Sequence, residues 1–291
     1  MTSDALETLG SQIDEAFFLI GGAILAIELI GGLIKGTLRW RSLGDMVASA
    51  STQLPFILIQ ITLLTGAFGI YVLISESLIT WTLPITAGTI VLAVLVADFT
   101  YYWEHRLAHE IRVLWLHHAV HHSSRHMNIV TGFRFGPFEG VWSIIAHLPM
   151  LFIGFSPEML LFGNLAVLAY QTWIHTELIG KLGPAEWVMN TASHHRVHHG
   201  CDDKYLDRNY AGILIIWDRL FGTFQVEEET PCYGLKRDFD SVNPLVVWFS
   251  EFPGFFRDLK NARSWGEAWM RTFGRPDWTP EPGAAALTER G

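Results

Sequence analysis

Residues 54–74 read LPFILIQITLLTGAFGIYVLI, a run of 21 residues without a charged side chain. A helix needs about 20 apolar residues to cross the hydrocarbon core of a bilayer. Because lipid cannot hydrogen-bond to the backbone, a single segment that crosses it has to be helical. The run therefore predicts a membrane-spanning helix and places the chain among the all-α integral membrane proteins.

Four further apolar runs predict helices of the same kind. They cover residues 16–34, 81–97, 141–156 and 159–175. The first of them contains one charged residue, Glu28, and the last two are separated only by Pro157 and Glu158. We expect the last two to form a helical hairpin that enters and leaves the membrane by the same face. The sequence thus predicts a bundle of about four to five hydrophobic helices.

The composition of the whole chain fits this class. Of the 291 residues, 50% are hydrophobic and 17% are charged, whereas a soluble domain carries about 25% charged residues. The net charge of −9 has the wrong sign for neutralising phosphates, which argues against a nucleic-acid partner. The two cysteines, Cys201 and Cys232, form no Cys-x-x-Cys pair, which argues against a thiolate zinc site and an iron–sulfur cluster.

Basic residues set the expected orientation of the chain. No Lys or Arg precedes Lys35, and Arg39 and Arg41 follow it closely. The positive-inside rule therefore places this loop in the cytoplasm. If each later apolar run crosses the membrane in turn, the protein is multi-pass. Its histidine-rich part then forms a helical cap on the cytoplasmic side. We divide the chain into amino-terminal membrane helices at 1–80, a catalytic region at 81–240, and an interfacial segment with a tail at 241–291.

All 13 histidines lie between His105 and His199, and most of them fall into three clusters. The clusters are His105-x-x-x-His109, His118-x-x-His121-His122 and His195-x-x-His198-His199. Side chains three and four residues apart share one helix face, so each cluster can converge on a point. Neutral imidazole is the commonest metal ligand, and eight exceed the about four to six ligands of one ion. The clusters therefore predict two metal ions, with His175 as a ninth candidate ligand.

Spacing alone leaves the choice of histidines open at two places. His117 with His121, and His194 with His198, are also four residues apart. Only the clusters named above repeat the same three-residue pattern. Neither the His-Glu-x-x-His motif of zinc proteases nor the Glu-x-x-His motif of soluble di-iron bundles occurs. An all-histidine dinuclear centre favours iron, because O2 activation needs a redox metal and zinc is not one.

The histidine series and the stretches at 98–110, 171–177 and 183–224 resemble the fatty acid hydroxylase/sterol desaturase superfamily of membrane di-iron oxygenases. Within it they resemble the alkylglycerol monooxygenase-like branch. The resemblance implies nine histidine ligands, namely His105, His109, His118, His121, His122, His175, His195, His198 and His199. It also implies that Glu110 is a functional acid near the centre, that the substrate is an ether lipid, and that the reductant is a pterin.

Asp98 is a further candidate functional residue. It lies seven residues before His105, hence on the same helix face. An ionisable group inside a membrane helix is functional by default. We expect its carboxylate to accept a hydrogen bond from a ligand imidazole and so to fix the tautomer of that ring.

The sequence as a whole predicts a membrane-bound non-haem di-iron monooxygenase that uses O2 to hydroxylate a C–H bond of a membrane lipid or sterol-like substrate. A separate donor would supply electrons, either a reduced pterin or a ferredoxin with its reductase. A lipid desaturase with the same di-iron centre is the nearer alternative, and a membrane metal-dependent hydrolase or a metal transporter is the farther one. A transporter would hold its ligands near mid-bilayer on broken helices, whereas these histidines cluster at and beyond the ends of the apolar runs.

Overall fold

A computed structural model describes residues 2–280, apart from the side chains at positions 54, 55, 60 and 64. Its α-helices are α1 (Ser3–Lys35), α2 (Trp40–Leu78), α3 (Ala87–Glu110), α4 (Arg112–His122), α5 (Glu139–His147), α6 (Pro149–Ile153), α7 (Pro157–Tyr170), α8 (Ala192–His198), α9 (Ile216–Phe221), α10 (Pro244–Trp248), α11 (Phe252–Lys260) and α12 (Trp265–Phe273). Three short 3-10 helices are η1 (Ile129–Phe133), η2 (Gln171–Trp173) and η3 (Gly183–Trp187). Within the described range there are isolated β-bridges but no strands, which confirms the all-α class.

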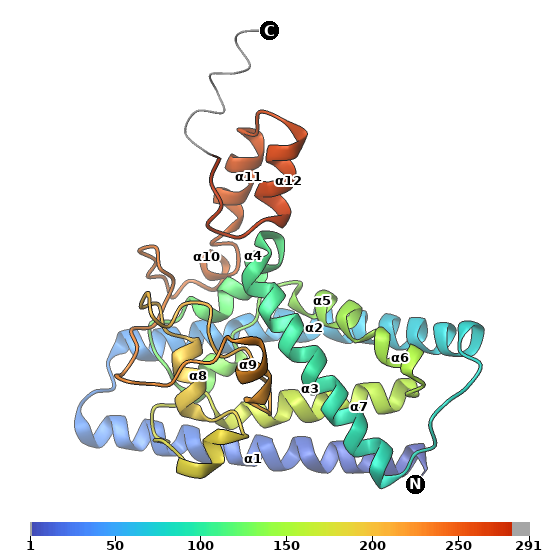
Figure 1. The fold of residues 1–291 in the computed structure, drawn as a ribbon. Helices are drawn as coiled ribbons and strands as arrows, with labels where there is room; N and C mark the ends of the chain where they lie inside the picture. The colour runs from blue at the N-terminus through green and yellow to red at the C-terminus, as the bar shows by residue number, and fades with distance from the viewer. Residues whose placement is uncertain (1, 281–291) are drawn as a thin grey trace, which may run out of the picture.

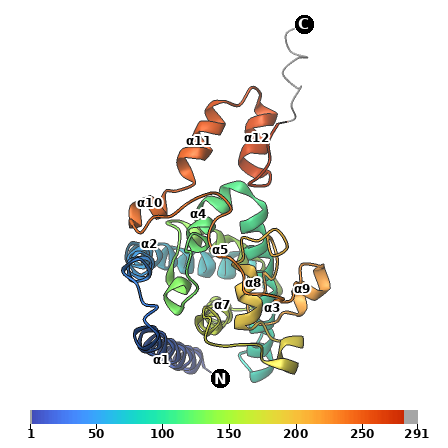
Figure 2. The same ribbon diagram turned by 90° about the vertical axis from the view of Figure 1, so that its left-hand side faces the viewer.

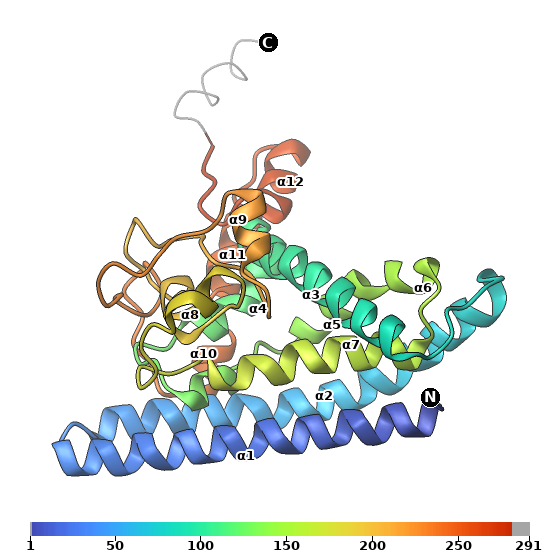
Figure 3. The same cartoon turned by 60° about the horizontal axis from the view of Figure 1, so that its bottom comes forward.

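The long helices α1 and α2 contain the apolar runs 16–34 and 54–74 (Figure 3). Among the described residues, these two helices are the ones long and apolar enough to cross a membrane. In their most apolar windows only 6% and 12% of the residues are buried. Large apolar side chains such as Phe18, Leu19 and Ile34 therefore face outward. This is the reverse of a core helix in a soluble protein, and it fits association with a membrane.

The other predicted apolar runs are interrupted. The third run becomes helical only at Ala87, after Pro84 and a Thr86 side chain that accepts a hydrogen bond from the Thr89 N–H at 3.2 Å. The fourth run breaks where α6 begins at Pro149, whose ring cannot continue the preceding helix. It ends at Gly154, which has a left-handed backbone with φ 101°. The chain then returns through α7, so α5, α6 and α7 form a hairpin with a broken first arm (Figure 1).

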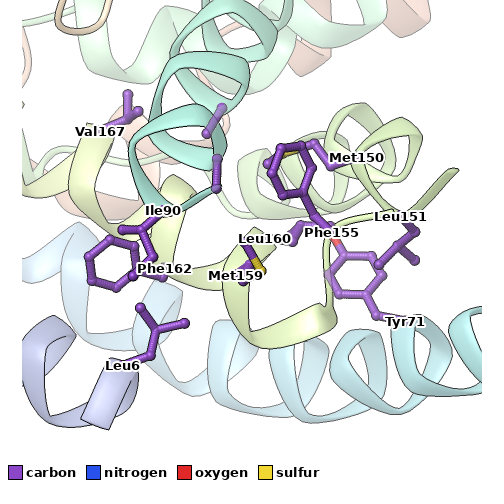
Figure 4. Close-up of a cluster of buried hydrophobic side chains, with 12 residues drawn as sticks. Leu6, Tyr71, Ile90, Met150, Leu151, Phe155, Met159, Leu160, Phe162 and Val167 are labelled. Carbon is purple, nitrogen blue, oxygen red and sulfur yellow. The ribbon is translucent and has the colours of Figure 1, made fainter. Parts of the chain in front are cut away.

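Helix α7 lies at the centre of the packing, against α3 on one side and α1 on the other (Figures 1 and 2). Gly163 permits the close approach to α3, because a Cβ atom there would lie 2.8 Å from the carbonyl oxygen of Ala93. The apolar core around this crossing includes Leu6 of α1, Met159 of α7 and Tyr71 of α2 (Figure 4). This packing fixes the direction of α3, whose last turns carry two of the candidate ligands.

The charged residue in the first apolar run is satisfied inside the protein. The Glu28 carboxylate accepts hydrogen bonds from the Thr176 hydroxyl at 2.5 Å and from the Ile129 N–H at 3.1 Å. Thr176 directly follows His175, so this hydrogen bond links α1 to the segment that carries this candidate ligand.

The carboxyl-terminal helices α11 and α12 form a hairpin that projects from the rest of the protein and contacts it through α4 (Figures 1 and 2). After α12, Arg275 returns to the body of the protein and pairs with Asp207 at 2.5 Å. Of the predicted segment 241–291, residues 281–291 lie outside the described part of the chain. The domain boundaries at residues 80 and 240 stay predictions.

Candidate metal centre

Nine buried histidines form two groups, and within each group one ring nitrogen per residue lies within 4.8 Å of the others. The five-histidine group consists of His105, His109, His118, His122 and His198, and the four-histidine group of His121, His175, His195 and His199. These are the nine residues that the sequence predicted as ligands. The other four histidines, His117, His126, His147 and His194, belong to neither group among the described residues.

The two repeated clusters divide between the groups in opposite ways. In the cluster at 118–122, the first and last histidines join the five-histidine group and the middle one joins the four-histidine group. The cluster at 195–199 does the reverse. On a helix, residues i and i+4 lie about 40° apart, whereas residue i+3 lies about 60° to the other side. Each of these two short segments therefore contributes to both groups.

Ring nitrogens inside each group are close enough to share one ion. Nε2 of His118 lies 3.0 Å from Nε2 of His105 and 3.2 Å from Nε2 of His122. In the four-histidine group, Nε2 of His195 lies 2.7 Å from Nε2 of His175. Ligand atoms at right angles around an ion with bonds of about 2.1 Å are about 3 Å apart. The donor sets therefore fit metal ions.

Hydrogen bonds on the outer side of the rings support the same fit. A backbone carbonyl oxygen can only accept, so a ring Nδ1 that meets one carries the hydrogen and leaves the Nε2 lone pair facing the group. Such bonds run from His105 to Tyr210 at 2.9 Å, from His175 to Gln171 at 3.0 Å and from His198 to Arg208 at 3.0 Å. Nε2 of His109 and of His198 is buried without a hydrogen-bond partner, as expected of nitrogens placed to bind a cation.

Burial keeps these rings neutral. Together with the nearby His118 ring, it lowers the pKa of His198 to about 3. Burial and neighbouring imidazoles also hold the pKa of His122, His195 and His199 well below the ordinary value. A neutral imidazole is the form that binds a metal.

Glu139 is a site residue that the sequence did not indicate. Its Oε1 accepts a hydrogen bond from His118 Nδ1 at 2.6 Å, and its Oε2 accepts one from the Gly136 N–H at 3.1 Å. Gly136 lies so close to α4 that a Cβ atom would be 2.3 Å from the His117 carbonyl oxygen. This close turn brings Glu139, the first residue of α5, to the five-histidine group. Glu139 has no regular spacing from the histidines in the sequence, so the sequence pattern did not indicate it.

The expectation for Asp98 was wrong about its partner. Its carboxylate accepts hydrogen bonds from the N–H groups of Ile213 at 2.6 Å and Leu214 at 3.0 Å, and from Trp217 Nε1 at 2.8 Å. None of these donors is an imidazole. Asp98 shares a helix face with His105, but seven residues of helix separate the two by about 10 Å along the axis. That distance is too long for a direct hydrogen bond.

Asp98 instead acts on the loop at 210–217, together with a second aspartate. Asp218 accepts hydrogen bonds from the N–H groups of Tyr210 at 2.8 Å and Ala211 at 2.9 Å. The carbonyl oxygen of Tyr210 is the acceptor for His105 Nδ1. Two buried carboxylates thus hold the loop that orients a candidate ligand.

Glu110 lies at the edge of the five-histidine group. Its Oε1 accepts a hydrogen bond from Arg106 Nε at 3.0 Å and lies 4.0 Å from Arg275. Arg275 also pairs with Asp207, whose Oδ1 is 3.5 Å from Nδ1 of His109. Among the described residues Glu110 has no hydrogen bond to an imidazole, and its implied role as a functional acid stays a prediction.

A cavity of about 1400 Å³ opens from the histidines and runs between α1, α2, α3, α5 and α7. His105 and His118 of one group and His121 and His175 of the other line it. Most of its remaining wall is apolar, and its volume exceeds the about 300–1,000 Å³ of ordinary small-molecule pockets. Both histidine groups therefore face one space large enough for a lipid.

Residues 90–223 match the fatty acid hydroxylase family. The alkylglycerol monooxygenase of Xenopus tropicalis is 41% identical over 65% of this chain and 45% of its own length. The human alkylglycerol monooxygenase is 35% identical over 98% of this chain and 64% of its own length. The ornithine lipid hydroxylase of Rhizobium tropici is 31% identical over 47% of this chain and 42% of its own length.

The chain thus spans less than two thirds of the length of these relatives. No solved structure matches it. The matched region begins in α3, ends after α9 and contains all nine grouped histidines. Residues 90–223 of this chain, which hold all nine grouped histidines, are thus similar to the fatty acid hydroxylase family.

Proposed function

We propose that this protein is a membrane-bound non-haem di-iron monooxygenase that uses O2 to hydroxylate a C–H bond of a lipid, with an alkylglycerol ether lipid as substrate. The observation that carries the proposal is the opening of two buried histidine groups onto one large apolar cavity. Similarity to alkylglycerol monooxygenases over most of the chain supports the ether-lipid substrate.

In this proposal each histidine group holds one iron ion, so that all nine grouped histidines are ligands. Bound iron would supply the redox chemistry for O2 activation, which zinc cannot supply. The protein orients the rings through outer hydrogen bonds, such as those from His105 to the Tyr210 carbonyl and from His118 to Glu139. The apolar wall of the cavity holds an apolar tail beside the histidines. A separate electron donor completes the system, either a reduced pterin or a ferredoxin with its reductase.

The reaction would be recognised by its products. Hydroxylation of the carbon next to an ether oxygen takes one oxygen atom from O2 and, with two electrons and two protons, releases the other as water. The product is a hemiacetal, which splits into an aldehyde and a free alcohol. We expect the iron-loaded protein, given 1-O-hexadecylglycerol, labelled O2 and a reduced pterin, to form hexadecanal that carries the label.

Mass spectrometry of the lipid products separates this proposal from the alternatives. Loss of two hydrogens without gain of oxygen would identify a desaturase. Unlabelled cleavage products, formed equally well without O2, would identify a metal-dependent hydrolase. Repeating the assay with a ferredoxin and its reductase in place of the pterin distinguishes the two kinds of electron donor.

We also propose that the protein crosses the membrane several times, through α1, α2, α3 and the hairpin of α5 to α7, with the histidines on the cytoplasmic side. Two basic residues support this orientation: Arg39, between α1 and α2, and Arg41, in the first turn of α2. A reporter inserted next to the exposed Asp203 should then read as cytoplasmic, and one at the amino terminus as external. The opposite readings would reverse the orientation, and equal readings would change the number of spans.

A further inference from the structure

A carboxyl group of the cavity wall next to the histidines has no part in the proposed metal centre. Glu104 belongs to α3 and lines the cavity, and its side chain is only 12% exposed. A charged or polar group in an apolar wall raises the free energy of the folded protein unless hydrogen bonds compensate it. The contacts of Glu104 therefore show how much compensation the protein itself provides.

The protein satisfies only one of the two oxygens of Glu104. The Ser143 hydroxyl of α5 donates to Oε2 at 3.2 Å. Nδ1 of His147 lies 3.5 Å from the same oxygen, but it is 2.9 Å from the Ser143 carbonyl oxygen, which takes its hydrogen. Within residues 2–280, as far as their side chains are described, no group donates to Oε1. That oxygen is left for a ligand in the cavity.

Two helices place this pair beside the histidines. Glu104 directly precedes His105 of the five-histidine group. Ser143 lies one helical turn after Glu139, whose carboxylate accepts the hydrogen bond from His118. The polar pair therefore lies at the end of the cavity where the reaction is proposed to occur.

The part of the cavity formed by α1 and α7 differs in character. Its wall includes Leu6, Phe162 and Leu165. Two acidic residues of α1, Glu7 and Asp14, also line the cavity, but both are exposed and their charges are solvated. Asn164 of α7 also lines this part, and its Oδ1 is buried without a hydrogen-bond partner. The apolar side chains around it offer an apolar tail a long surface.

We propose that Glu104 and Ser143 form a polar subsite that binds a hydroxyl group in the head region of the lipid. The head group then lies next to the histidines, and the tail extends along α1 and α7. This inference rests on the proposed lipid function and adds to it the residues that hold the head group. The carbon presented to the histidines is one near the head group, not one at the end of the tail. The unpartnered oxygen of the Glu104 carboxyl group can accept a hydrogen bond from a hydroxyl, which suits Glu104 to this task.

Binding of two probes to the purified full-length chain in detergent tests the subsite. The probes are 1-O-hexadecylglycerol and its dimethyl ether, which has the same tail but no hydroxyl donor. We expect the unmodified protein to bind the diol about five- to tenfold more tightly, the worth of one hydrogen bond. Glu104→Leu, which removes the acceptor, and Ser143→Ala should each remove most of this preference and leave binding of the dimethyl ether unchanged.

Glu158→Gln is the matched control. Glu158 also lines the cavity, but it lies in the first turn of α7, away from the histidines. This variant should keep the full preference for the diol. Equal binding of both probes by the unmodified protein would overturn the proposal, as would an equal loss for both probes in the Glu104 variant. If Glu104→Leu does not fold, Ser143→Ala decides the question by the same measurement.

The direction of the lipid has its own test. A photoreactive diazirine placed next to the head group should crosslink to α3 or α5, and one at the end of the tail should crosslink to α1 or α7. The reverse pattern would place the head group near Glu7 and Asp14 and overturn the proposal. Neither test requires iron, O2 or turnover, so a failure of the proposed oxygenase activity would be seen separately from a failure of the subsite.

Discussion

Helices α1 and α8 follow opposite rules. Along α1 large apolar side chains face outward, with Phe18 72% exposed and Ile34 81% exposed. In α8 all seven residues are buried, and five of the seven have polar side chains. Arg196 of α8 is satisfied by the Glu227 carboxylate at 2.7 Å and by the carbonyl oxygens of Thr176 and Ile179.

The difference shows that the chain meets two environments. An apolar surface such as that of α1 is stable against lipid, where a hydrophobic side chain has no water to avoid. A polar helix such as α8 is stable inside the protein only because hydrogen bonds replace the water that its groups have lost. The predictions below disturb one environment or the other.

Removing a ligand should have the largest effect. His198→Ala and His121→Ala each take one ring out of a different histidine group, and we expect loss of activity and of bound iron while the helices still insert into the membrane. Iron content by mass spectrometry and helix content by circular dichroism measure the two outcomes. His126→Ala is the control, because His126 belongs to neither group. Activity retained by a protein that contains only zinc would refute the iron assignment.

Breaking the buried ion pair behind α4 should come next. Arg134 is fully buried, and it donates to Asp45 at 2.7 Å and to the Val120 carbonyl oxygen at 3.1 Å. Arg134→Met leaves the Asp45 charge without its partner, which costs about 3–5 kcal/mol of stability. Thermal unfolding in detergent measures the loss. Arg41→Ala removes the arginine of an exposed pair and should cost much less stability, because solvent screens that pair. Equal losses in both variants would contradict the buried role of Arg134.

Asp98→Asn should have an intermediate effect. It removes the charge that holds three N–H donors of the loop behind His105. We expect a loss of about 10–100-fold in metal affinity or activity, the range of outer supports of metal ligands. Iron titration of the purified variant measures it, and Asp203→Asn, on the surface, should change nothing. Full iron content and activity in Asp98→Asn would show that the loop keeps its shape without this charge.

Trimming the outer face of α1 should have the smallest effect. Leu19 is 64% exposed, and Leu19→Ala should change stability in detergent by less than about 0.5 kcal/mol. Leu160→Ala is the comparison, since Leu160 of α7 is completely buried and its loss leaves a cavity that costs about 2–5 kcal/mol. A large effect at Leu19 would mean that α1 packs against another protein surface.

The fold was predictable where the composition of a continuous run of residues decides the structure. The run at 54–74 is helical because its composition alone leaves no other structure in lipid. The break at Pro149 and the late start of α3 at Ala87 depend on single residues inside otherwise apolar runs, so counting charges did not find them. The same counting cannot separate a span from a core segment such as α7.

The site was predictable to the level of its nine histidines and no further. Helical spacing brings each cluster to one face, but the division into groups depends on how α4 and α8 face each other. The supports of the rings come from distant parts of the chain: Tyr210 is 105 residues from His105, and Glu139 is 21 residues from His118. Asp98 was placed on the correct helix face, but its partners lie 115 to 119 residues away.

The opposite division of the two repeated clusters has a consequence for assembly of the holoenzyme. Helices α4 and α8 each carry histidines of both groups. An ion bound in one group would therefore also hold in place the two helices that supply ligands to the other group. Loading with two ions, as proposed, should then be cooperative, and the half-loaded state should be scarce. The wrong metal in one group would likewise disturb its neighbour, so this centre would be inactivated as a unit and would have to be repaired as one.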